Sequence, residues 1–317
     1  MSAQLKSFIL HRANELGFDH VGIARPARLA GDALRAWLDQ GFHGEMDYLA
    51  AHLDLRLDPD QLLAGAASVI MFAVNYHTPF NPSPDPNKGI ISKYAWGDDY
   101  HLVLASRLKQ LWKEIQQHHA QLHGRIFVDS APVLEKEWAM VSGIGWMGKN
   151  CCIISPKFGS WIFLAGMLID IDLPTDAPIK NRCGTCRLCI DACPTGALLE
   201  PYLLDSRRCI SYLTVELKAD RDIPVERRSN MGNRIFGCDV CQSVCPWNHK
   251  LEKPTLDPAF YPRPAFQAPW LSDLLHWDEE TFREQIKGSP LRRAKYAGFK
   301  RNVQIAWNNR PSAHTLR

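Results

Sequence analysis

Eight cysteines in the second half of the chain have types and spacing suited to binding metal. One run, Cys183–Pro194, reads C-G-T-C-R-L-C-I-D-A-C-P, and a second, Cys238–Pro246, reads C-D-V-C-Q-S-V-C-P, with Cys209 alone between them. The first run matches the C-x2-C-x2-C-x3-C-P pattern, in which three close thiolates bind one [4Fe-4S] cluster and the fourth reaches another cluster. The spacing therefore predicts two [4Fe-4S] clusters.

The second run reproduces the last three positions of this pattern, and its missing first cysteine would fall at Ile235. We infer that Cys209 supplies that thiolate from a distance. Because the fourth cysteine of each run crosses over to the other cluster, two ligand sets follow. Cluster one takes Cys183, Cys186, Cys189 and Cys245, and cluster two takes Cys209, Cys238, Cys241 and Cys193.

Zinc sites and disulfides are the alternatives for these thiols. Structural zinc favours two separated C-x2-C pairs that close one tetrahedron. Here a third cysteine follows a complete C-x2-C after two residues, and both runs end in Cys-Pro. Disulfides are disfavoured because the sequence opens with no secretory signal. Cys151 and Cys152 are left over in an apolar stretch, which favours core packing.

Composition indicates a globular protein. The chain has 317 residues, of which 46% are hydrophobic, enough for one large core and a smaller module, and 22% are charged, which argues against disorder. Its longest apolar runs, residues 68–74 and 161–169, are too short to span a bilayer. We therefore expect a cytoplasmic protein with no membrane partner.

The elements that position these residues alternate between helix and strand over the first 170 or so residues, which predicts a layered sheet-and-helix domain. Helices are expected at 5–16, 32–40, 45–53, 100–123, 133–141, 277–286 and 291–307, and extended segments at 18–24, 68–76, 90–96, 125–129, 151–155 and 160–169. We expect three parts: residues 1–174 form the layered domain, 175–250 the cluster module, and 251–317 a basic, helical C-terminal region.

Asp129 stands at the end of a predicted strand, where catalytic groups often lie. A carboxyl group there is a candidate general acid. It is also suited to cap a helix, since Asp129 or Ser130 just precedes a predicted helix with Pro132 near its start. Residue types alone favour the cap, and the acid stays open as the alternative.

The charge of the C-terminal region is uneven. From Thr281 to Arg317 there are nine Lys or Arg residues against one acid, Glu284. This asymmetry indicates either a polyanionic partner or a solvated basic tail. The sequence has no phosphate-binding P-loop and no dinucleotide fingerprint. We therefore expect electrons to reach the clusters from an external low-potential donor.

Five segments together resemble the epoxyqueuosine reductase family. They are K-Y-A-W-G-D-D-Y-H (93–101), V-D-S-A-P-V-L-E-K (128–136), G-W-M-G-K-N (145–150), C-G-T-C-R-L-C-I-D-A-C-P-T-G-A (183–197) and G-C-D-V-C-Q-S-V-C-P-W-N (237–248). The resemblance implies an α+β fold: a cobalamin-binding domain like those of nitroreductases and reductive dehalogenases, then a two-[4Fe-4S] ferredoxin-like module. It implies reduction of the epoxide of epoxyqueuosine in the tRNA anticodon loop to queuosine, by cobalamin that the clusters supply with electrons.

The resemblance also assigns roles to residues. Asp129 of the D-S-x-P motif would donate the proton, and a dry pocket with an aromatic wall would raise its pKa. The implied cobalamin contacts are Lys93, Tyr94, Asp99, Tyr100, His101, Lys149, Asn150, Ser155, Gly159 and Ser160. The cations expected to hold tRNA phosphates are Arg207, Arg208, Arg227, Arg228, Arg292, Arg293, Lys295, Lys300 and Arg301.

Two alternatives and one departure accompany the resemblance. The alternatives are a reductive dehalogenase of a small molecule, expected to carry a twin-arginine leader that this sequence lacks, and a non-catalytic iron–sulfur electron carrier. Family members often end in a HEAT-like repeat region that touches tRNA. Residues 301–309 are expected to form only the first part of such a repeat. This affects the expected extent of the tRNA contact and not the expected chemistry.

Overall fold

A four-stranded antiparallel sheet forms the centre of the N-terminal half of the computed structural model, which describes residues 2–311. The strand order is β1 (His20–Ala24), β2 (Ser68–Asn75), β7 (Ile162–Ile169) and β4 (Gly124–Phe127). All eight residues of β2 are buried, because helices cover both faces of the sheet. This agrees with the apolar, β-branched character of its sequence.

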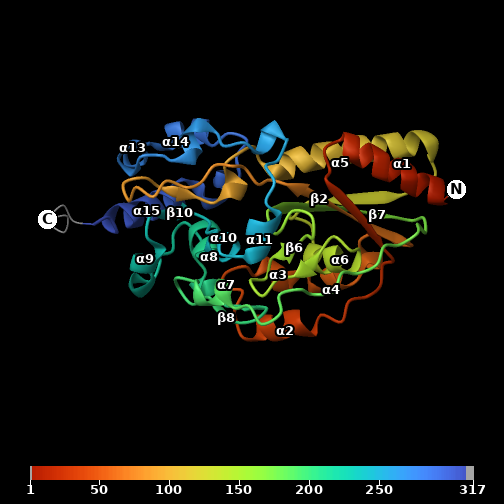
Figure 1. Ribbon diagram of the computed structural model, residues 1–317, viewed down its shortest axis with the longest axis horizontal. Coiled ribbons are helices and arrows are strands. Elements are labelled where there is room, and N and C mark those ends of the chain that lie inside the picture. The colour runs from red at the N-terminus through yellow and green to blue at the C-terminus, as the bar shows by residue number, and fades with distance from the viewer. Residues whose placement is uncertain (1, 312–317) are drawn as a thin grey trace.

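Helices α1 (Ser2–Glu15) and α5 (Tyr100–His118) lie on one face of the sheet, and α6 (Glu135–Val141) lies on the other (Figure 1). Successive side chains of β2 enter the two cores in turn, as a strand's twofold alternation requires. Phe72 packs with the core under α1 and α5, and Met71 packs with the core that contains α6. The predicted layered domain is confirmed.

Shorter elements connect these layers. They are α2 (Asp32–Asp39), α3 (Tyr48–Ala51), α4 (Leu53–Leu57), β5 (Trp146–Met147) and β6 (Ile153–Ile154). The single helix expected at 45–53 is wrong, because His52 leaves helical geometry at φ −126° and separates α3 from α4. The strand expected at 151–155 is also shorter, since Cys151 has a left-handed backbone (φ 62°) that ends regular pairing.

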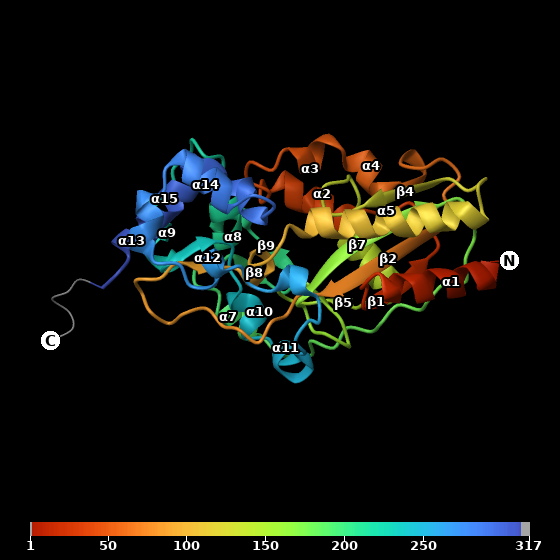
Figure 2. The same cartoon turned by 90° about the horizontal axis from the view of Figure 1, so that it is seen from above.

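The cysteine-rich part contains only short elements, as expected of a module held together by metal. They are α7 (Leu188–Asp191), β8 (Leu198–Glu200), β9 (Leu203–Leu204), α8 (Ile210–Val215), α9 (Val225–Met231), β10 (Arg234–Phe236), α10 (Val240–Ser243) and α11 (Pro246–Leu251). Figure 2 shows α7, α10 and α11 gathered beside the edge of the N-terminal layers.

The C-terminal helices build a second core around a strand from the N-terminal half. Strand β3 (Ile90–Ile91) pairs in parallel with β10. Its side chains pack with α12 (Pro264–Gln267), α13 (Leu271–His276), α14 (Glu279–Gln285) and α15 (Lys295–Asn308). The three expected parts are thus interleaved at residues 90–96, which lie in the core of the C-terminal part.

Buried Asn302 fixes α15 in this core, because its side-chain amide donates to Thr214 O (2.9 Å) and Ile235 O (3.0 Å). Between residues 2 and 311, none of the helices combines the length and apolar character needed to cross a membrane.

Candidate active site and cluster-binding module

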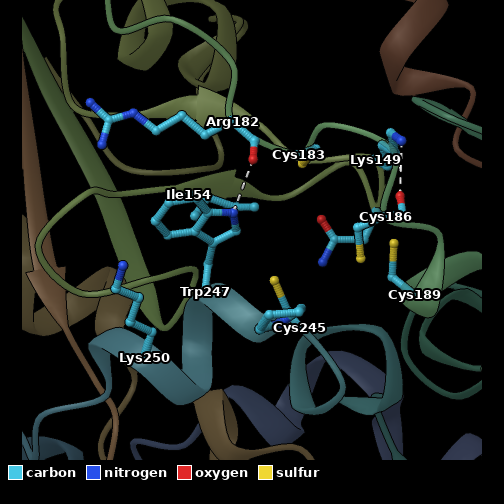
Figure 3. A pocket seen from close by; sticks show the side chains of 11 residues that line it. Lys149, Ile154, Arg182, Cys183, Cys186, Cys189, Cys245, Trp247 and Lys250 are labelled. Atoms are coloured by element: carbon cyan, nitrogen blue, oxygen red, sulfur yellow. Dashed lines mark hydrogen bonds between the residues drawn. The ribbon is translucent and has the colours of Figure 1, made fainter.

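Four cysteines from two distant segments surround one cavity. Cys183, Cys186 and Cys189 come from the first run, and Cys245 comes from the start of α11 (Figure 3). These are the four residues of the predicted set one. Cys193, although it belongs to the same run, does not line this cavity. The fold therefore brings together the thiols that the crossing-over pattern requires.

The other four cysteines lie close enough to affect one another's ionisation. The pKa of the Cys241 thiol is raised well above its ordinary value by the neighbouring Cys152, by burial, and by Cys238 and Cys209. Cys193 is also among the groups that act on Cys209. The Cys193 Sγ accepts the Ala197 N–H at 3.2 Å, a bond that suits a thiolate bound to metal.

The arrangement of the thiols fits a cluster better than a single ion. Among residues 2–311, no three His, Cys, Asp or Glu side chains are arranged to hold one metal ion. The thiols of set one instead line an open cavity (Figure 3). A cubane with a thiolate on each of its irons needs such a cavity, whereas tetrahedral zinc needs convergence on one point.

The G-W-M-G-K-N segment holds the loops that carry these cysteines. The Lys149 ammonium donates to Gly184 O (2.6 Å) and Cys186 O (2.8 Å), within the first run. The Asn150 amide donates to Cys241 O (3.3 Å), in the second run. Both residues were expected to contact cobalamin, and in the structure their side chains bind backbone carbonyl groups of the two cysteine runs. Cys152 also lies against Cys241, so it packs beside a predicted ligand and not simply within an apolar core.

Asp129 belongs to a chain of hydrogen-bonded side chains. Asp129 Oδ2 accepts from the Tyr100 hydroxyl at 3.0 Å and lies 3.0 Å from His101 Nε2. On the other side of the ring, His101 Nδ1 lies 2.7 Å from Asp99 Oδ1. Asp99 also caps α5 by accepting the His101 N–H, which explains how a helix start places the ring between two carboxylates.

This chain corrects the expected pKa of Asp129. The hydrogen bond with His101 lowers the pKa of Asp129 and outweighs burial, which acts in the opposite direction. Burial lowers the pKa of His101, but its hydrogen bonds with Asp129 and Asp99 outweigh that effect and raise the value to about 9. The expected dry carboxylic acid is therefore wrong. At neutral pH the proton resides on His101, paired with an ionised Asp129.

Asp129 is not a helix cap. Helix α6 begins at Glu135, and its N-cap residue is Leu134, so Asp129 stands five residues before the cap. The Asp129 backbone adopts φ 54°, in the left-handed region that is uncommon for residues other than glycine. Glu135 Oε1 accepts the Asp129 N–H at 2.6 Å and holds this conformation.

Glu135 is a candidate site residue that the sequence analysis did not single out. Burial and the neighbouring Asp129 charge raise its pKa to about 8. The available signal was an acid six residues after Asp129, at the start of the same predicted helix.

The remaining expected cobalamin contacts lie along the junction of the two halves. The Ser160 hydroxyl bonds Gln242 and Asn248 of the cluster module (3.0 and 3.2 Å). A Cβ on Gly159 would come within 2.2 Å of Asn248 Oδ1, so only glycine allows this approach. Ser155 pairs with Gly159 in an isolated bridge.

Lys93 and Tyr94 occupy the same junction. The Lys93 ammonium is buried over the rings of Trp96 and Trp161, and burial lowers its pKa. Tyr94 packs edge-on against Tyr100, next to Asp129. Several buried polar atoms near this lysine have no protein partner among the described residues: His77 Nδ1, Thr78 Oγ1 and Ser92 Oγ. A buried cation and unpartnered polar atoms fit a large polar cofactor that carries amides and a phosphate, as cobalamin does.

The nine cations expected to hold tRNA have different environments. Lys300 and Arg301 donate hydrogen bonds to backbone carbonyl groups of other segments. Arg301 donates to Leu213 O at 2.9 Å and to Arg221 O at 2.6 Å. Arg228 donates to Ile223 O. Arg207 pairs with Asp205, and the exposed Arg293 with Glu216.

Arg292 and Lys295 are both exposed, and Arg292 lies 3.3 Å from Asp99 Oδ2, next to the Asp129 chain. Arg227 is half-buried, and Arg208 Nε is buried without a partner in the described part of the chain. Arg317, counted in the basic C-terminal stretch, lies outside the described residues.

Two family models match the chain. One, described as epoxyqueuosine reductase QueG, DUF1730, covers residues 56–130, and one described as a 4Fe-4S double cluster binding domain covers residues 182–248. The first contains the Asp99–Asp129 chain and the second contains all eight predicted ligands. The chain therefore has a 4Fe-4S double cluster binding domain.

Whole-chain relatives carry the same description. The epoxyqueuosine reductase of Escherichia coli (strain K12) is 45% identical over 319 residues, covering 99% of this chain and 83% of that protein. The epoxyqueuosine reductase of Cyclobacterium marinum is 44% identical, covering 93% of this chain and 94% of its own.

Solved structures agree with this description. An epoxyqueuosine reductase bound to an epoxyqueuosine-modified tRNA-Tyr stem loop superposes with a TM-score of 0.89 at 33% identity, covering 96% of this chain and 81% of that one. The enzyme from Streptococcus thermophilus gives 0.85 at 29% identity, covering 98% and 82%. A catabolic reductive dehalogenase is a more distant match, with a TM-score of 0.47 and 16% identity, covering 81% of this chain and 33% of that one. On this identity and coverage, the chain belongs to the epoxyqueuosine reductase family.

Proposed function

We propose that this protein reduces the epoxide of epoxyqueuosine in the tRNA anticodon loop to give queuosine. Its relatives of about 45% identity carry that activity in their names, and a structural neighbour holds an epoxyqueuosine-modified tRNA stem loop. The observation that carries the proposal is the Asp129–His101–Asp99 chain. It forms a proton-bearing pair at the end of the sheet, in which Asp129 is exposed and His101 is half-buried.

Removal of the epoxide oxygen as water consumes two electrons and two protons. Bound cobalamin, held at the junction that contains Lys93, would supply the electrons for this reduction. The protein's own task is then to neutralise the departing oxygen. His101 holds the proton, and its partner Asp129, which is 62% exposed, can relay that proton to a substrate oxygen. Tyr100 donates to the same carboxylate and orients it.

We assign the eight cysteines to two clusters as the pattern predicts. Set one comprises Cys183, Cys186, Cys189 and Cys245, and set two comprises Cys193, Cys209, Cys238 and Cys241. The four-cysteine cavity supports the first set, and the mutual influence of the buried thiols supports the second. We place cobalamin at the junction of Lys93, Tyr94 and Ser160, where buried polar atoms lack partners.

The contact that we propose with the tRNA substrate is electrostatic. Arg292 and Lys295 would bind phosphates of the anticodon stem-loop, because both are exposed and Arg292 adjoins Asp99. The modified base must leave its stack to reach Asp129, as in other enzymes that act on a base. We place the protein in the cytoplasm, where tRNA is found and cysteines remain reduced.

Anaerobic reconstitution with iron, sulfide and cobalamin, followed by nucleoside analysis of epoxyqueuosine-containing tRNA, tests this function. Queuosine should form with a chemical reductant and disappear when cobalamin is omitted. Full iron content and bound cobalamin without any queuosine would contradict the proposal and would favour an electron carrier. Turnover of a halogenated phenol in place of the tRNA would favour the dehalogenase alternative.

A further inference from the structure

The cavity of cysteine set one is bordered by cations that have no counter-charge. Arg182 and Lys250 line its outer side, both are exposed, and neither forms an ion pair within residues 2–311. Trp247 lies between them: its indole N–H donates to Arg182 O (3.3 Å), and the Lys250 ammonium lies 5.6 Å from its ring centre. Figure 3 shows the Arg182 guanidinium directed away from the four thiols.

Two further exposed cations lie within five residues of Arg182 in the sequence. Lys180 is exposed and unpaired in the described part of the chain. Arg187 approaches Asp191 only to 3.8 Å, and both side chains are more than half exposed, so solvent screens the pair. Leu188, next to Cys189, is 51% exposed. We call this surface the cluster-one rim, and it consists of Lys180, Arg182, Arg187, Leu188, Trp247 and Lys250.

The rim borders the open cavity of set one. The thiols of set one line an open cavity, whereas Cys209 and Cys238 of set two pack against the apolar cluster that contains Tyr212 and Met231. Electron transfer between proteins requires the two redox groups to approach closely. Electrons from outside therefore have their shortest entry at set one.

The charge and the aromatic centre of this surface identify the kind of partner. We propose that the cluster-one rim docks a small, low-potential, one-electron carrier protein with an acidic face around its redox group, of the flavodoxin or ferredoxin type. Arginine and tryptophan are the residues enriched at the centres of protein interfaces, and opposite charges steer encounter. In the step, one electron leaves the reduced carrier and enters cluster one, with no bond broken and no proton moved.

This inference rests on the proposed cluster assignment but not on the tRNA chemistry. The cations placed on tRNA, Arg292 and Lys295, come from a different segment, which packs beside Asp99. A nucleic-acid role for the rim is the competing outcome, because phosphates would also favour these cations.

Stopped-flow bleaching of the clusters by reduced flavodoxin, in the reconstituted protein without tRNA, tests the proposal. In the Arg182→Glu/Lys250→Glu protein, the second-order rate constant at low salt should fall at least about 10-fold, because steering contributes about 10- to 1,000-fold. The wild-type rate constant should itself decline as salt rises. The control Lys109→Glu/Lys113→Glu makes the same change of charge on α5, which lies away from α11 (Figures 1 and 2). It should leave the rate constant unaltered.

Dithionite, a small reductant, separates docking from damage. It should bleach the reversed protein as fully as the wild type, at equal iron content. If the Arg182→Glu/Lys250→Glu protein does not hold iron, the Arg182→Gln and Lys250→Gln variants replace it. The flavodoxin rate constant should then decrease by a smaller factor. An unchanged flavodoxin rate constant in iron-replete variants would overturn the proposal. Loss of tRNA affinity with normal flavodoxin kinetics would do the same and assign the rim to nucleic acid.

Failure of the proposed function would look different. Clusters that flavodoxin reduces through the rim, in a protein that makes no queuosine even with dithionite, would leave the docking surface standing and remove the tRNA activity.

Discussion

At the scale of single residues, the candidate active site is a proton shared between an acid and a base. His101 lies between Asp99 and Asp129, and the two carboxylates raise its pKa to about 9. This arrangement keeps a proton beside the substrate position at neutral pH without a carboxyl group of unusually high pKa. Because Asp129 is 62% exposed, solvent screens the ion pair, and its main effect is on chemistry and not on stability.

Replacing Asp129 with asparagine tests the acid. The amide can still accept from Tyr100, but it cannot take up the His101 proton and relay it to the substrate, so turnover should fall about 10²- to 10⁴-fold. Iron content and cobalamin absorbance should stay at wild-type levels, which serves as the control. Near-normal queuosine formation by the cofactor-replete variant would retire Asp129 as the acid.

The pH dependence reports on His101. The value of kcat/KM should decline above about pH 9 as His101 loses its proton, and Asp99→Asn should move that decline to lower pH. Asparagine caps a helix nearly as well as aspartate, so α5 should persist. Since folding raises the pKa of His101 from 6.5 to about 9, the stability it contributes is complete below pH 6.5 and lost as pH rises through 9. Identical pH profiles for the two proteins would contradict this account.

At the scale of elements, the loop between β4 and α6 decides where Asp129 points. Asp129 carries a left-handed backbone that costs about 1–3 kcal/mol outside glycine. The bond from its N–H to Glu135 at the start of α6 holds that geometry. Helix α6 thus positions Asp129 through its first side chain, Glu135, although Asp129 does not cap the helix.

Glu135→Ala should release this loop. We expect kcat to fall about 10-fold or more, since a displacement of about 1 Å in a catalytic group can cost 10²-fold. Glu135→Gln resembles the protonated acid that a pKa of about 8 favours, keeps an acceptor for the Asp129 N–H, and should retain most activity. Equal losses in the two variants, measured as kcat at saturating tRNA, would mean that the carboxyl group itself acts in the reaction.

At the scale of the whole molecule, distant segments complete each site. The fold inserts β3 of the N-terminal half beside β10 of the cluster module, and α15 covers both. Arg292 from the C-terminal region reaches Asp99 at the start of α5. The candidate active site, the clusters and the basic surface are therefore parts of one packed unit.

Cys209→Ser tests the assignment of the isolated cysteine. Two cubanes give about eight iron atoms per chain, and loss of one set should leave about four. Cys151→Ser is the matched control, because Cys151 belongs to neither set, and it should retain full iron. Undiminished iron in Cys209→Ser would refute its role as a ligand, and the cluster signals in electron paramagnetic resonance would show which set remains.

Salt should weaken tRNA binding steeply, because each neutralised phosphate releases counterions. Arg292→Gln/Lys295→Gln should lower both the affinity and the salt slope, with little effect on unfolding temperature, since both side chains are exposed. Arg301→Gln should instead lower the unfolding temperature, because its guanidinium bonds backbone carbonyls of residues 213, 218 and 221. Salt-insensitive binding would exclude this electrostatic contact.

The sequence by itself determined the features that depend on local spacing and on apolar pattern. The cysteine intervals predicted the double-cluster domain, and the uninterrupted apolar run of β2 predicted a buried strand. Both follow from short-range rules: a metal cluster needs thiolates at fixed intervals, and a covered strand needs apolar residues on both sides.

Only the tertiary structure decided the features that depend on contacts between distant residues. Asp129 could be a helix cap or an acid until the start of α6 at Glu135 and the approach of His101 removed the first choice. Its pKa was expected to rise, and the neighbouring imidazole, which comes from 28 residues earlier, lowers it instead. The hydrogen bond from Lys149 to Gly184 O likewise joins residues that are far apart in the sequence. A pKa or a hydrogen bond depends on distances in space, which the order of residues along the chain does not contain.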